Sequence, residues 1–228
     1  MHAAAIVAAA GSGSRLGADL PKALVPLAGR PLVCRAVDAL LDGGVAEVIV
    51  VVPAAQRAEF EAALPAGVVV VDGGATRTAS VRAGLAAVGS AATAVLVHDA
   101  ARPLIPAAVI ARVLDAIAAG APAVVPVLPV VDTTVLVDDD GLVTDTVPRA
   151  PLRRVQTPQG FDRATLEAAY AGLEAGADLT DDAAVVRRVG VPVATVAGDE
   201  LCAKVTVAHD LALAELLLRA DDTQEVPW

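Results

Sequence analysis

The sequence is short of aromatic residues, of cysteines and of long uncharged apolar runs. Aromatic residues make up 2% of its 228 positions although 56% are hydrophobic, so small aliphatic side chains must fill the core. Its two cysteines are too few for a disulfide framework or a zinc site, and we expect Cys34 and Cys202 to be buried apolar residues. No stretch of about 18 apolar residues is free of charge, proline and glycine, which excludes a membrane-spanning helix.

Positive charge is scarce as well. The 17 Lys and Arg residues are outnumbered by 27 Asp and Glu residues, and the formal net charge is −10. This balance excludes a general nucleic-acid or anionic-membrane surface, because such partners need a broad positive potential. The apolar residues 1–10 lack a basic leader and run directly into glycines, so we interpret them as a first strand and expect a cytoplasmic protein. Any phosphate site must be built locally from few cations.

Val-rich runs alternate with segments of helical spacing along most of the chain. The predicted strands are 4–8, 47–52, 68–71, 93–97, 123–127 and 191–196. The predicted helices are 31–41, 54–64, 78–88, 107–119, 163–175, 181–189 and 207–219. Near-continuous apolar strands between amphipathic helices indicate a parallel sheet covered on both faces. We therefore predict a three-layer, Rossmann-like α/β fold with a mostly parallel sheet, in a single domain over residues 1–228.

The alternation breaks in the segment that follows the fifth predicted strand. Two short strand patterns, 133–137 and 142–147, flank the turn signal Asp138-Asp139-Asp140-Gly141. This pattern predicts a β-hairpin arm at about 131–155 that protrudes from the sheet.

A glycine-rich loop follows the first predicted strand. Small side chains in residues 8–17 let backbone N–H groups approach phosphate oxygens. A dinucleotide-binding fold would place a third glycine at Leu16 and an acidic residue near Pro53, and both are missing. The Gly-Lys-Ser/Thr of a P-loop is missing as well. These departures count against an NAD-dependent oxidoreductase and exclude a P-loop protein.

Two cations accompany the loop in an otherwise acidic protein. Arg15 lies inside it and Lys22 comes after Pro21, so both can converge on a triphosphate. The competing interpretation is a flexible turn with two solvated surface charges, which is a common arrangement. The segment does not stand alone, and further motifs favour the first interpretation.

Residues 8–22 resemble the signature loop of nucleotidyltransferases that activate sugar or polyol phosphates. Further motifs resemble those of the methylerythritol phosphate cytidylyltransferases, in the same order and at similar spacing over essentially the whole chain. These motifs are Asp72-Gly73-Gly74 with Arg77, Ser80-Val81 and Gly84-Leu85, then His98-Asp99-Ala100-Ala101-Arg102-Pro103, Asp132-Thr133, Arg149, Gln156-Thr157-Pro158-Gln159, Thr180-Asp181-Asp182 and Lys204-Val205-Thr206. The resemblance implies transfer of CMP from CTP to 2-C-methyl-D-erythritol 4-phosphate, with magnesium and with release of pyrophosphate.

The resemblance also implies which residues bind CTP. Arg15, Lys22 and Lys204 would surround the α-phosphate and the leaving group, where fixed cations stabilise the charge of the transferring phosphoryl group. The other nucleotide-binding residues would be Ala9, Ala10, Gly11, Gly74, Ser80 and Ala100. Ser80 has a second interpretation, as a hydroxyl that satisfies N–H groups at a helix start. Ala75 stands where some relatives carry Asp, which removes one polar contact for cytosine.

The acceptor-binding residues implied by the resemblance are Asp99, Arg102, Thr133, Arg149, Thr157 and Thr180. Asp99 ends an apolar strand, where a carboxylate is costly to bury without partners, so it binds a substrate hydroxyl or helps hold magnesium. Arg102 contacts the acceptor or forms an ion pair with Asp99 that shapes the loop. Arg149 offers a bidentate contact for phosphate. His98 is interpreted as structural, because no zinc-type spacing connects it to another histidine.

A homodimer, in which the hairpin arm completes the partner's site, is a further implication of the resemblance. Two other functions stay open at this point. A ribitol 5-phosphate cytidylyltransferase would share the loop and the lysines and differ in its acceptor contacts. A non-catalytic nucleotide-binding protein would use the same scaffold, because fold alone does not establish activity, although retention of all three cations disfavours it.

Overall fold

The structure is a computed structural model, and it describes residues 1–11, 20–174 and 179–222. Its central sheet has eight strands in the order β10-β7-β11-β6-β1-β4-β5, with β12 also paired to β7. These strands are β1 (Ala3–Ala8), β4 (Glu47–Val52), β5 (Val69–Asp72), β6 (Ala94–Asp99), β7 (Ala123–Pro129), β10 (Arg153–Val155), β11 (Gln159–Asp162) and β12 (Ala194–Ala197). The pairs among β1, β4, β5 and β6 are parallel, whereas β10 and β11 run antiparallel to their neighbours. The predicted mostly parallel sheet is confirmed.

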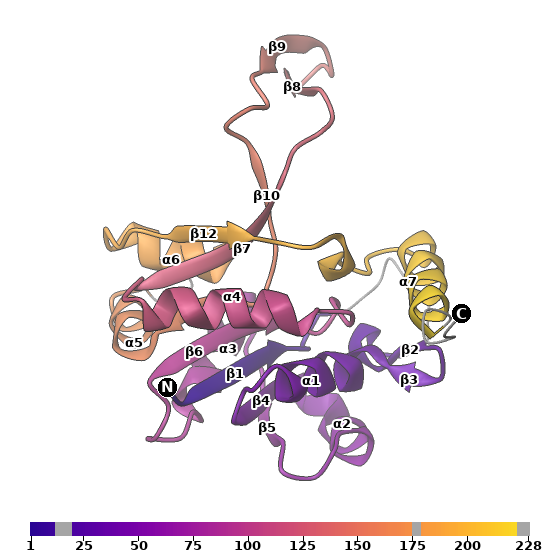
Figure 1. The fold of residues 1–228 in the computed structure, drawn as a ribbon, viewed down its shortest axis with the longest axis vertical. Coiled ribbons are helices and arrows are strands. Elements are labelled where there is room, and N and C mark those ends of the chain that lie inside the picture. The colour runs from indigo at the N-terminus through magenta and orange to yellow at the C-terminus, as the bar shows by residue number, and fades with distance from the viewer. Residues whose placement is uncertain (12–19, 175–178, 223–228) are drawn as a thin grey trace, which may run out of the picture.

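Helices cover both faces of the sheet (Figure 1). They are α1 (Leu32–Asp42), α2 (Arg57–Ala63), α3 (Arg77–Ala86), α4 (Ala107–Ala118), α5 (Arg163–Ala171), α6 (Asp182–Arg188) and α7 (Ala208–Asp222), with 3-10 turns at Lys22–Leu24, Ala54–Gln56 and Glu200–Cys202. Ala5 and Val7 of β1 belong to the core cluster of α1 and α4, whereas Ala4 and Ile6 belong to that of α3, α5 and α6. Burial on both faces explains why the strands are apolar at nearly every position. The predicted three-layer α/β fold is confirmed.

The last helix packs against a short segment that follows the glycine-rich loop, outside the main sheet. A short hairpin, β2 (Pro26–Leu27) and β3 (Arg30–Pro31), follows the glycine-rich loop. Leu27 of this hairpin shares a third buried cluster with Val205 and with Ala214 of α7. Helix α7 and the hairpin β2–β3 therefore meet beside the segment that contains the predicted site residue Lys204. None of the helices in the described ranges is long and apolar enough to cross a membrane.

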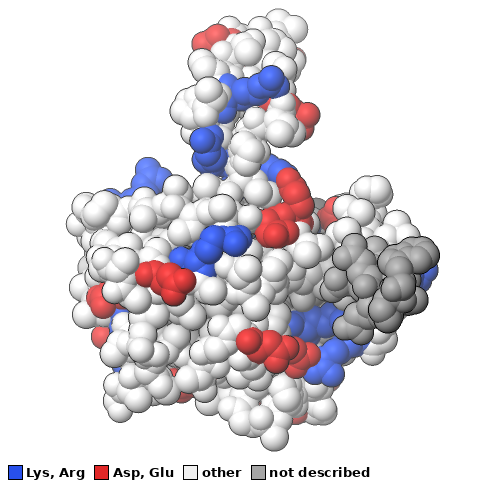
Figure 2. Space-filling model, in the orientation of Figure 1, with Lys and Arg blue, Asp and Glu red and all other residues white. Residues whose placement is uncertain are grey.

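A second hairpin projects from the body as an arm (Figure 1). It consists of β8 (Thr134–Val137) and β9 (Val143–Val147), which pair antiparallel between β7 and β10 in the chain. Most of its surface in the space-filling view carries no charge (Figure 2). Its exposed large apolar side chains are Val131, Val135, Leu136, Val137, Leu142 and Val143. The predicted arm is confirmed, and its apolar side chains make an uncovered surface of the kind that often marks an interface.

Four strands were not predicted: β2 and β3, which form a hairpin, and β10 and β11. β11 lies antiparallel between β6 and β7, and its sequence Gln-Gly-Phe-Asp lacks the Val-rich pattern of the other core strands. Gly160 is required there, because a Cβ at this position would lie 2.4 Å from a methyl carbon of Val113. The close approach of α4 to the sheet therefore decides the residue, and strand propensity does not.

Candidate functional site

Three loops meet at the carboxyl edge of the parallel strands. The N–H groups of Ala9 and Gly73 donate to carbonyls at the end of β4, at 2.9 and 2.7 Å, and that of Ala100 donates to Ala8 at 3.2 Å. These bonds continue the strand pairing beyond the strand ends, so the loops after β1, β5 and β6 are held side by side. Ligands of open α/β sheets bind at this edge. The structure thus brings together the predicted CTP-binding residues that follow these three strands.

The turn after β5 is packed too tightly for side chains. A Cβ on Gly73 would lie 3.0 Å from the Cβ of Ala10, and one on Gly74 would lie 2.5 Å from the Cβ of Ala79. The buried Ser80 hydroxyl accepts the Gly74 N–H at 3.1 Å and donates to a backbone carbonyl near the start of α3 at 2.9 Å. Ser80 therefore shapes this turn from within the helix, and the hydroxyl that accepts an N–H group of the helix start is that of Thr76. The contact of Ser80 with cytosine stays a prediction.

Asp99 lies at the end of β6 among three cations. Its Oδ2 atom is 2.9 Å from Lys204 Nζ and 3.6 Å from Arg102 Nε, and its Oδ1 atom is 3.9 Å from a terminal nitrogen of Arg77. The side chain is only 14% exposed. Burial alone would raise its pKa, but the charges of Lys204, Arg77 and Arg102 outweigh that effect and lower the pKa of Asp99 to about 2. The carboxylate is therefore ionised at any physiological pH and fixes the cations around it.

Lys204 and Arg102 differ in how far their side chains are exposed to solvent. The Lys204 side chain is 46% exposed, so its ammonium group can reach a ligand. The Arg102 side chain is 13% exposed and donates from Nη1 to the Cys202 carbonyl at 2.7 Å, while its buried Nε has no hydrogen-bond partner in the described part of the chain. The ion pair of Arg102 with Asp99, which the sequence left as an alternative, is present in the structure. A contact of Arg102 with the acceptor stays a prediction.

The third cation is held by a buried carboxylate that sequence reasoning did not assign. Asp182 at the start of α6 is fully buried, and it accepts from Arg77 at 2.6 Å and from the Tyr170 hydroxyl at 2.6 Å. Burial would lower the pKa of Arg77, but the charge of Asp182 and the hydrogen bond to it raise that pKa. Asp182 thus fixes Arg77 beside Asp99. The motif containing Asp181 and Asp182 was the available signal, but the sequence does not show that the two carboxylates differ in burial.

Thr157 and His98 lie in the interior, next to Asp99. Thr157 is 5% exposed and precedes β11, and its Oγ1 atom accepts the Asp99 N–H at 3.1 Å and lies 2.8 Å from His98 Nδ1. His98 is fully buried, and burial lowers its pKa to about 4. The interpretation of His98 as structural is confirmed. The hydroxyl of Thr157 takes part in bonds within the protein, and its contact with the acceptor phosphate stays a prediction.

Lys22 begins the 3-10 turn after the glycine-rich loop and lies near the start of α7. Asp210 in the first turn of α7 accepts the N–H groups of Thr206 and Val207 at 2.7 and 2.9 Å. The bond from Val207 lowers the pKa of Asp210 most, and the charge of Lys22 contributes to the same shift. Lys22 therefore approaches the segment that directly follows Lys204. The other predicted cation, Arg15, lies outside the described residues.

Of the remaining acceptor candidates, the two on the arm lie away from this cluster. Thr133 and Arg149 are exposed on the arm, and the Arg149 guanidinium donates to the Val131 carbonyl of the arm itself. Thr180 is exposed just before α6. Figure 1 shows the arm pointing away from the sheet. Within one chain, the structure does not bring the arm residues to Asp99.

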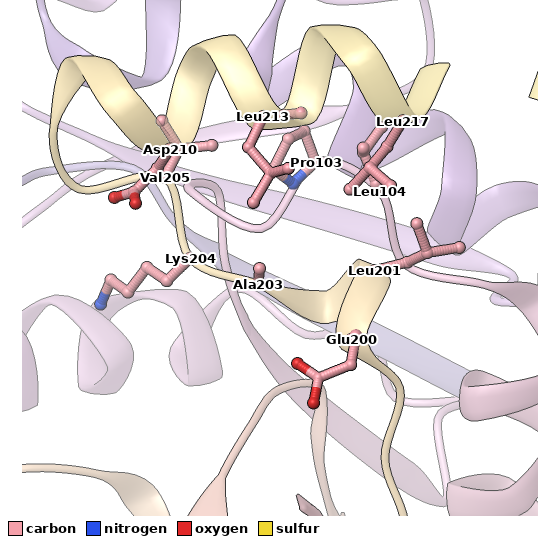
Figure 3. A pocket seen from close by; sticks show the side chains of 11 residues that line it. Pro103, Leu104, Glu200, Leu201, Ala203, Lys204, Val205, Asp210, Leu213 and Leu217 are labelled. Carbon is pink, nitrogen blue, oxygen red and sulfur yellow. The ribbon is translucent and has the colours of Figure 1, made fainter. Parts of the chain in front are cut away.

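A cavity of about 230 Å³ adjoins Lys204 (Figure 3). Leu213 and Leu217 of α7 line it together with Leu104, and most of its other lining residues are also apolar. Its charged lining residues are Glu200, Lys204 and Asp210. A triphosphate needs concentrated positive charge, so the cluster around Asp99 is the better candidate for the phosphate site.

The structure also bears on how magnesium would be held. Among the described residues, no three His, Cys, Asp or Glu side chains are grouped so that they can hold a metal ion. Asp99 offers one carboxylate, and both of its oxygens face cations. Magnesium commonly binds through one or two carboxylates together with substrate phosphates and waters. These residues fit a magnesium ion that arrives with the triphosphate, and they do not fit a metal held by the protein alone.

The chain is similar to known proteins over residues that include both the sheet edge and the arm. The family model described as 2-C-methyl-D-erythritol 4-phosphate cytidylyltransferase matches residues 3–220. The chain is similar to the proteins of that name from Nocardia farcinica, at 55% identity over 94% of this chain and 93% of the relative, and from Saccharopolyspora erythraea, at 52% identity over 96% and 100%. Its fold is similar to the crystal structure of the protein of that name from Thermus thermophilus, with a TM-score of 0.79, 40% identity and coverage of 96% and 100%.

Proposed function

The chain belongs to the 2-C-methyl-D-erythritol 4-phosphate cytidylyltransferase family, and we propose that the edge site around Asp99 is where it carries out the family's reaction. The protein transfers CMP from CTP to 2-C-methyl-D-erythritol 4-phosphate, in the methylerythritol phosphate pathway of isoprenoid biosynthesis. An oxygen of the acceptor phosphate forms a bond to the α-phosphorus of CTP, while the bond from that phosphorus to the oxygen bridging to the β-phosphate breaks. Pyrophosphate leaves with that oxygen, and the product is 4-diphosphocytidyl-2-C-methyl-D-erythritol.

The observation that carries the proposal is the position of Lys204. Its ammonium group is 2.9 Å from Asp99 and half-exposed at the carboxyl edge of the sheet, in a protein with a net charge of −10. Because Asp99 stays ionised, it holds Lys204 in place without removing its proton. A fixed cation at this point stabilises the charge that gathers on the α-phosphate oxygens in the transition state. The role of Lys204 is therefore electrostatic and needs no proton transfer.

Lys22 acts from the other side of the same nucleotide in this proposal. Its charge is felt by Asp210, which caps the segment that follows Lys204, and this supports a shared substrate for the two lysines. Arg15 is assigned to the triphosphate from the family resemblance of the glycine-rich loop. The three cations together would balance much of the charge of the triphosphate and its pyrophosphate leaving group.

The nucleoside of CTP would lie across the loops that follow β1, β5 and β6. Backbone amide groups of Ala9, Ala10 and Gly11 are placed to meet the nucleotide, and Ala100 is placed for the ribose. Gly74 is exposed and held by Ser80, so its backbone is available to the edge of the cytosine base. Selectivity for the base then depends on backbone groups, whose positions the tight glycine packing fixes.

Magnesium is proposed to reach the site bound to the triphosphate, with Asp99 as the protein carboxylate beside it. When bound there, the ion would supply positive charge to the phosphate oxygens, in addition to the charge of the lysines. The protein's own part is to keep Asp99 ionised and to hold Lys204 and Arg77 around it.

The acceptor would be bound by residues of two subunits. Asp99 and Thr180 belong to the body, whereas Thr133 and Arg149 lie on the arm, which projects away from the sheet. The uncovered apolar side chains of the arm supply a surface for a second copy of the chain. We therefore propose a homodimer in which each arm carries Arg149 to the partner's acceptor phosphate.

A substrate panel tests the reaction. With CTP and magnesium, we expect pyrophosphate release with 2-C-methyl-D-erythritol 4-phosphate and little with ribitol 5-phosphate or with UTP. The matched control is Lys204→Ala, which should bind CTP with little turnover. Turnover of ribitol 5-phosphate alone would reject the acceptor, and tight CTP binding without any pyrophosphate would favour a non-catalytic protein.

A mixing experiment tests the arm. The Lys204→Ala variant and the Arg149→Ala variant are each expected to have low activity at low acceptor concentration. If Arg149 serves the partner's site, mixed dimers contain one site with an intact Lys204 and an intact Arg149, so mixing restores part of the activity. If Arg149 serves its own chain, every site in the mixed dimer lacks one of the two residues. The absence of any gain, with subunit exchange verified by mass spectrometry, would reject the crossed arm.

A further inference from the structure

Side chains beneath the turn of residues 99–102 bind it at both ends. The turn closes with the Arg102 N–H donating to the Asp99 carbonyl at 2.9 Å. At its first residue, the Asp99 N–H donates to Thr157 Oγ1 at 3.1 Å. At its last residue, the Arg102 carbonyl lies 3.1 Å from His98 Nε2. The circle is completed by the 2.8 Å contact of Thr157 Oγ1 with His98 Nδ1.

For a neutral His98 ring, only one arrangement of protons satisfies all of these contacts. The Arg102 carbonyl can only accept, so His98 Nε2 must carry a proton. A neutral imidazole then presents Nδ1 as an acceptor, and the single proton of the Thr157 hydroxyl goes to it. A lone pair of Thr157 Oγ1 then accepts the Asp99 N–H. The fully buried position of His98 agrees with a neutral ring.

The same turn also carries the segment that contains Lys204. The Ala101 carbonyl accepts the Val205 N–H at 2.8 Å, and the Arg102 guanidinium donates to the Cys202 carbonyl at 2.7 Å. These two bonds lie on either side of Lys204 along the chain. A displacement of the turn would therefore move Lys204 together with its carboxylate partner Asp99.

We propose that Thr157 and His98 are positioning residues that fix the turn of residues 99–102 and, through it, the pairing of Asp99 with Lys204. Thr157 acts through His98 and Asp99, and it is not a ligand of the acceptor phosphate. To donate to a phosphate, its hydroxyl would have to leave His98 Nδ1, which would strand a buried acceptor without a partner. The inference rests on the site roles proposed above.

Kinetics of two Thr157 variants separate positioning from direct binding. Thr157→Val removes the hydroxyl at similar volume, and we expect kcat to fall about 10- to 100-fold, as misplacement of reacting groups does. Thr157→Ser keeps the hydroxyl and should restore most of kcat. A matched control is Thr165→Val, which removes a hydroxyl at the start of α5, outside the site, and should leave kcat unchanged. A rise in the acceptor KM alone in Thr157→Val would overturn the proposal.

The imidazole nitrogen-15 spectrum supplies a readout that a mere loss of stability would not move. At neutral pH, we expect the wild-type His98 signals to show a neutral ring protonated at Nε2, with the assignment made by their loss in His98→Gln. The other two histidines, His2 and His209, are exposed and give a contrast within the same sample. In Thr157→Val the Nδ1 signal should shift, because that atom loses its donor, and in Thr157→Ser it should return.

The wild-type spectrum keeps the inference testable even when Thr157→Val does not fold. A wild-type His98 protonated at Nδ1, or a charged ring at neutral pH, would overturn the proton arrangement. Failure of the proposed function has a different signature, since the wild-type protein would then release no pyrophosphate while the His98 signals still reported the predicted ring state.

Discussion

The sheet edge around Asp99 and the hairpin arm are assigned to the same acceptor, yet they are organised in opposite ways. At the sheet edge, Asp99 is 14% exposed and its neighbours are bound to one another through buried groups such as Asp182. On the arm, Thr133 and Arg149 are exposed, and Arg149 contacts the arm's own backbone. The chain thus fixes the nucleotide side of the site by its own packing. The positions of the arm's exposed side chains depend on the surface that the arm contacts.

The difference predicts that substitutions at the sheet edge affect stability and catalysis strongly, whereas those on the arm affect acceptor binding. The largest effect is expected at Asp182. Asp182→Ala leaves Arg77 and Tyr170 without their buried partner, which should lower the free energy of unfolding by about 3–5 kcal/mol. Urea unfolding measures it. The arm control, Asp145→Ala, removes an exposed carboxylate and should change stability by less than about 0.5 kcal/mol. Equal effects of the two would remove the contrast.

The next largest effect concerns Lys204. Lys204→Ala should lower kcat by about 10²- to 10³-fold, because a fixed cation at the transferring phosphate is lost. The side chain is 46% exposed, so the fold should survive, as circular dichroism can show. Lys22→Ala should lower kcat by a similar factor. A steady-state assay that returned near-normal turnover for either variant would contradict its assignment to the reacting phosphates.

A smaller effect is expected on the pH dependence of the free energy of unfolding, through Asp99. Its pKa is lowered from 3.8 to about 2 in the folded protein, so the unfolded chain binds more protons in this interval. The carboxylate therefore contributes about 2 kcal/mol at neutral pH, and this contribution disappears as the pH falls from about 4 to about 2. Unfolding free energies across this range should fall more steeply for the wild type than for Asp99→Asn. Parallel curves would show that the three cations do not stabilise the charged form.

The smallest effect is expected on the arm. Arg149→Ala should raise the acceptor KM about tenfold with the CTP KM little changed, because Arg149 is assigned to the acceptor phosphate and not to CTP. Arg187→Ala, an exposed arginine on α6, is the matched control and should change neither constant. An effect confined to CTP would mean that the arm does not serve the acceptor.

Much of the fold was predictable because buried parallel strands are apolar at nearly every position, which is easily recognised in the sequence. The strand at Glu47–Val52 has the predicted bounds, and the arm was located from its Asp-Gly turn. The hairpin β2–β3 escaped because each strand has two residues and its turn uses Ala28 at a positive φ of 47°, where glycine or asparagine is usual. β11 was not predicted because it is short and lacks a Val-rich pattern, and its Gly160 is set by the packing of α4.

Site residues that belong to a local motif could be predicted from the sequence. Contacts between residues far apart in the sequence could not. Asp99 and Lys204, 105 positions apart, are paired in the structure, and motif resemblance had placed both at the site. Arg77 and Asp182 are equally far apart, and no local pattern indicates that one fixes the other. The bonds of Thr157 to His98 were also beyond sequence reasoning, since a threonine hydroxyl gives the same pattern whether it faces a ligand or a buried ring.

The reversed direction of β11 determines which parts of the chain tolerate changes in length. Gln159 lies opposite Val97, and continuing that antiparallel register places Thr157 opposite Asp99. Thr157 therefore lies just before the N-terminal end of β11, whereas Asp99 is the C-terminal residue of β6. One residue inserted between β10 and β11 would exchange the partner of Asp99. A change of length in the arm would leave this register intact, because β10 stays paired with β7, but it would move Arg149 relative to the partner's acceptor phosphate.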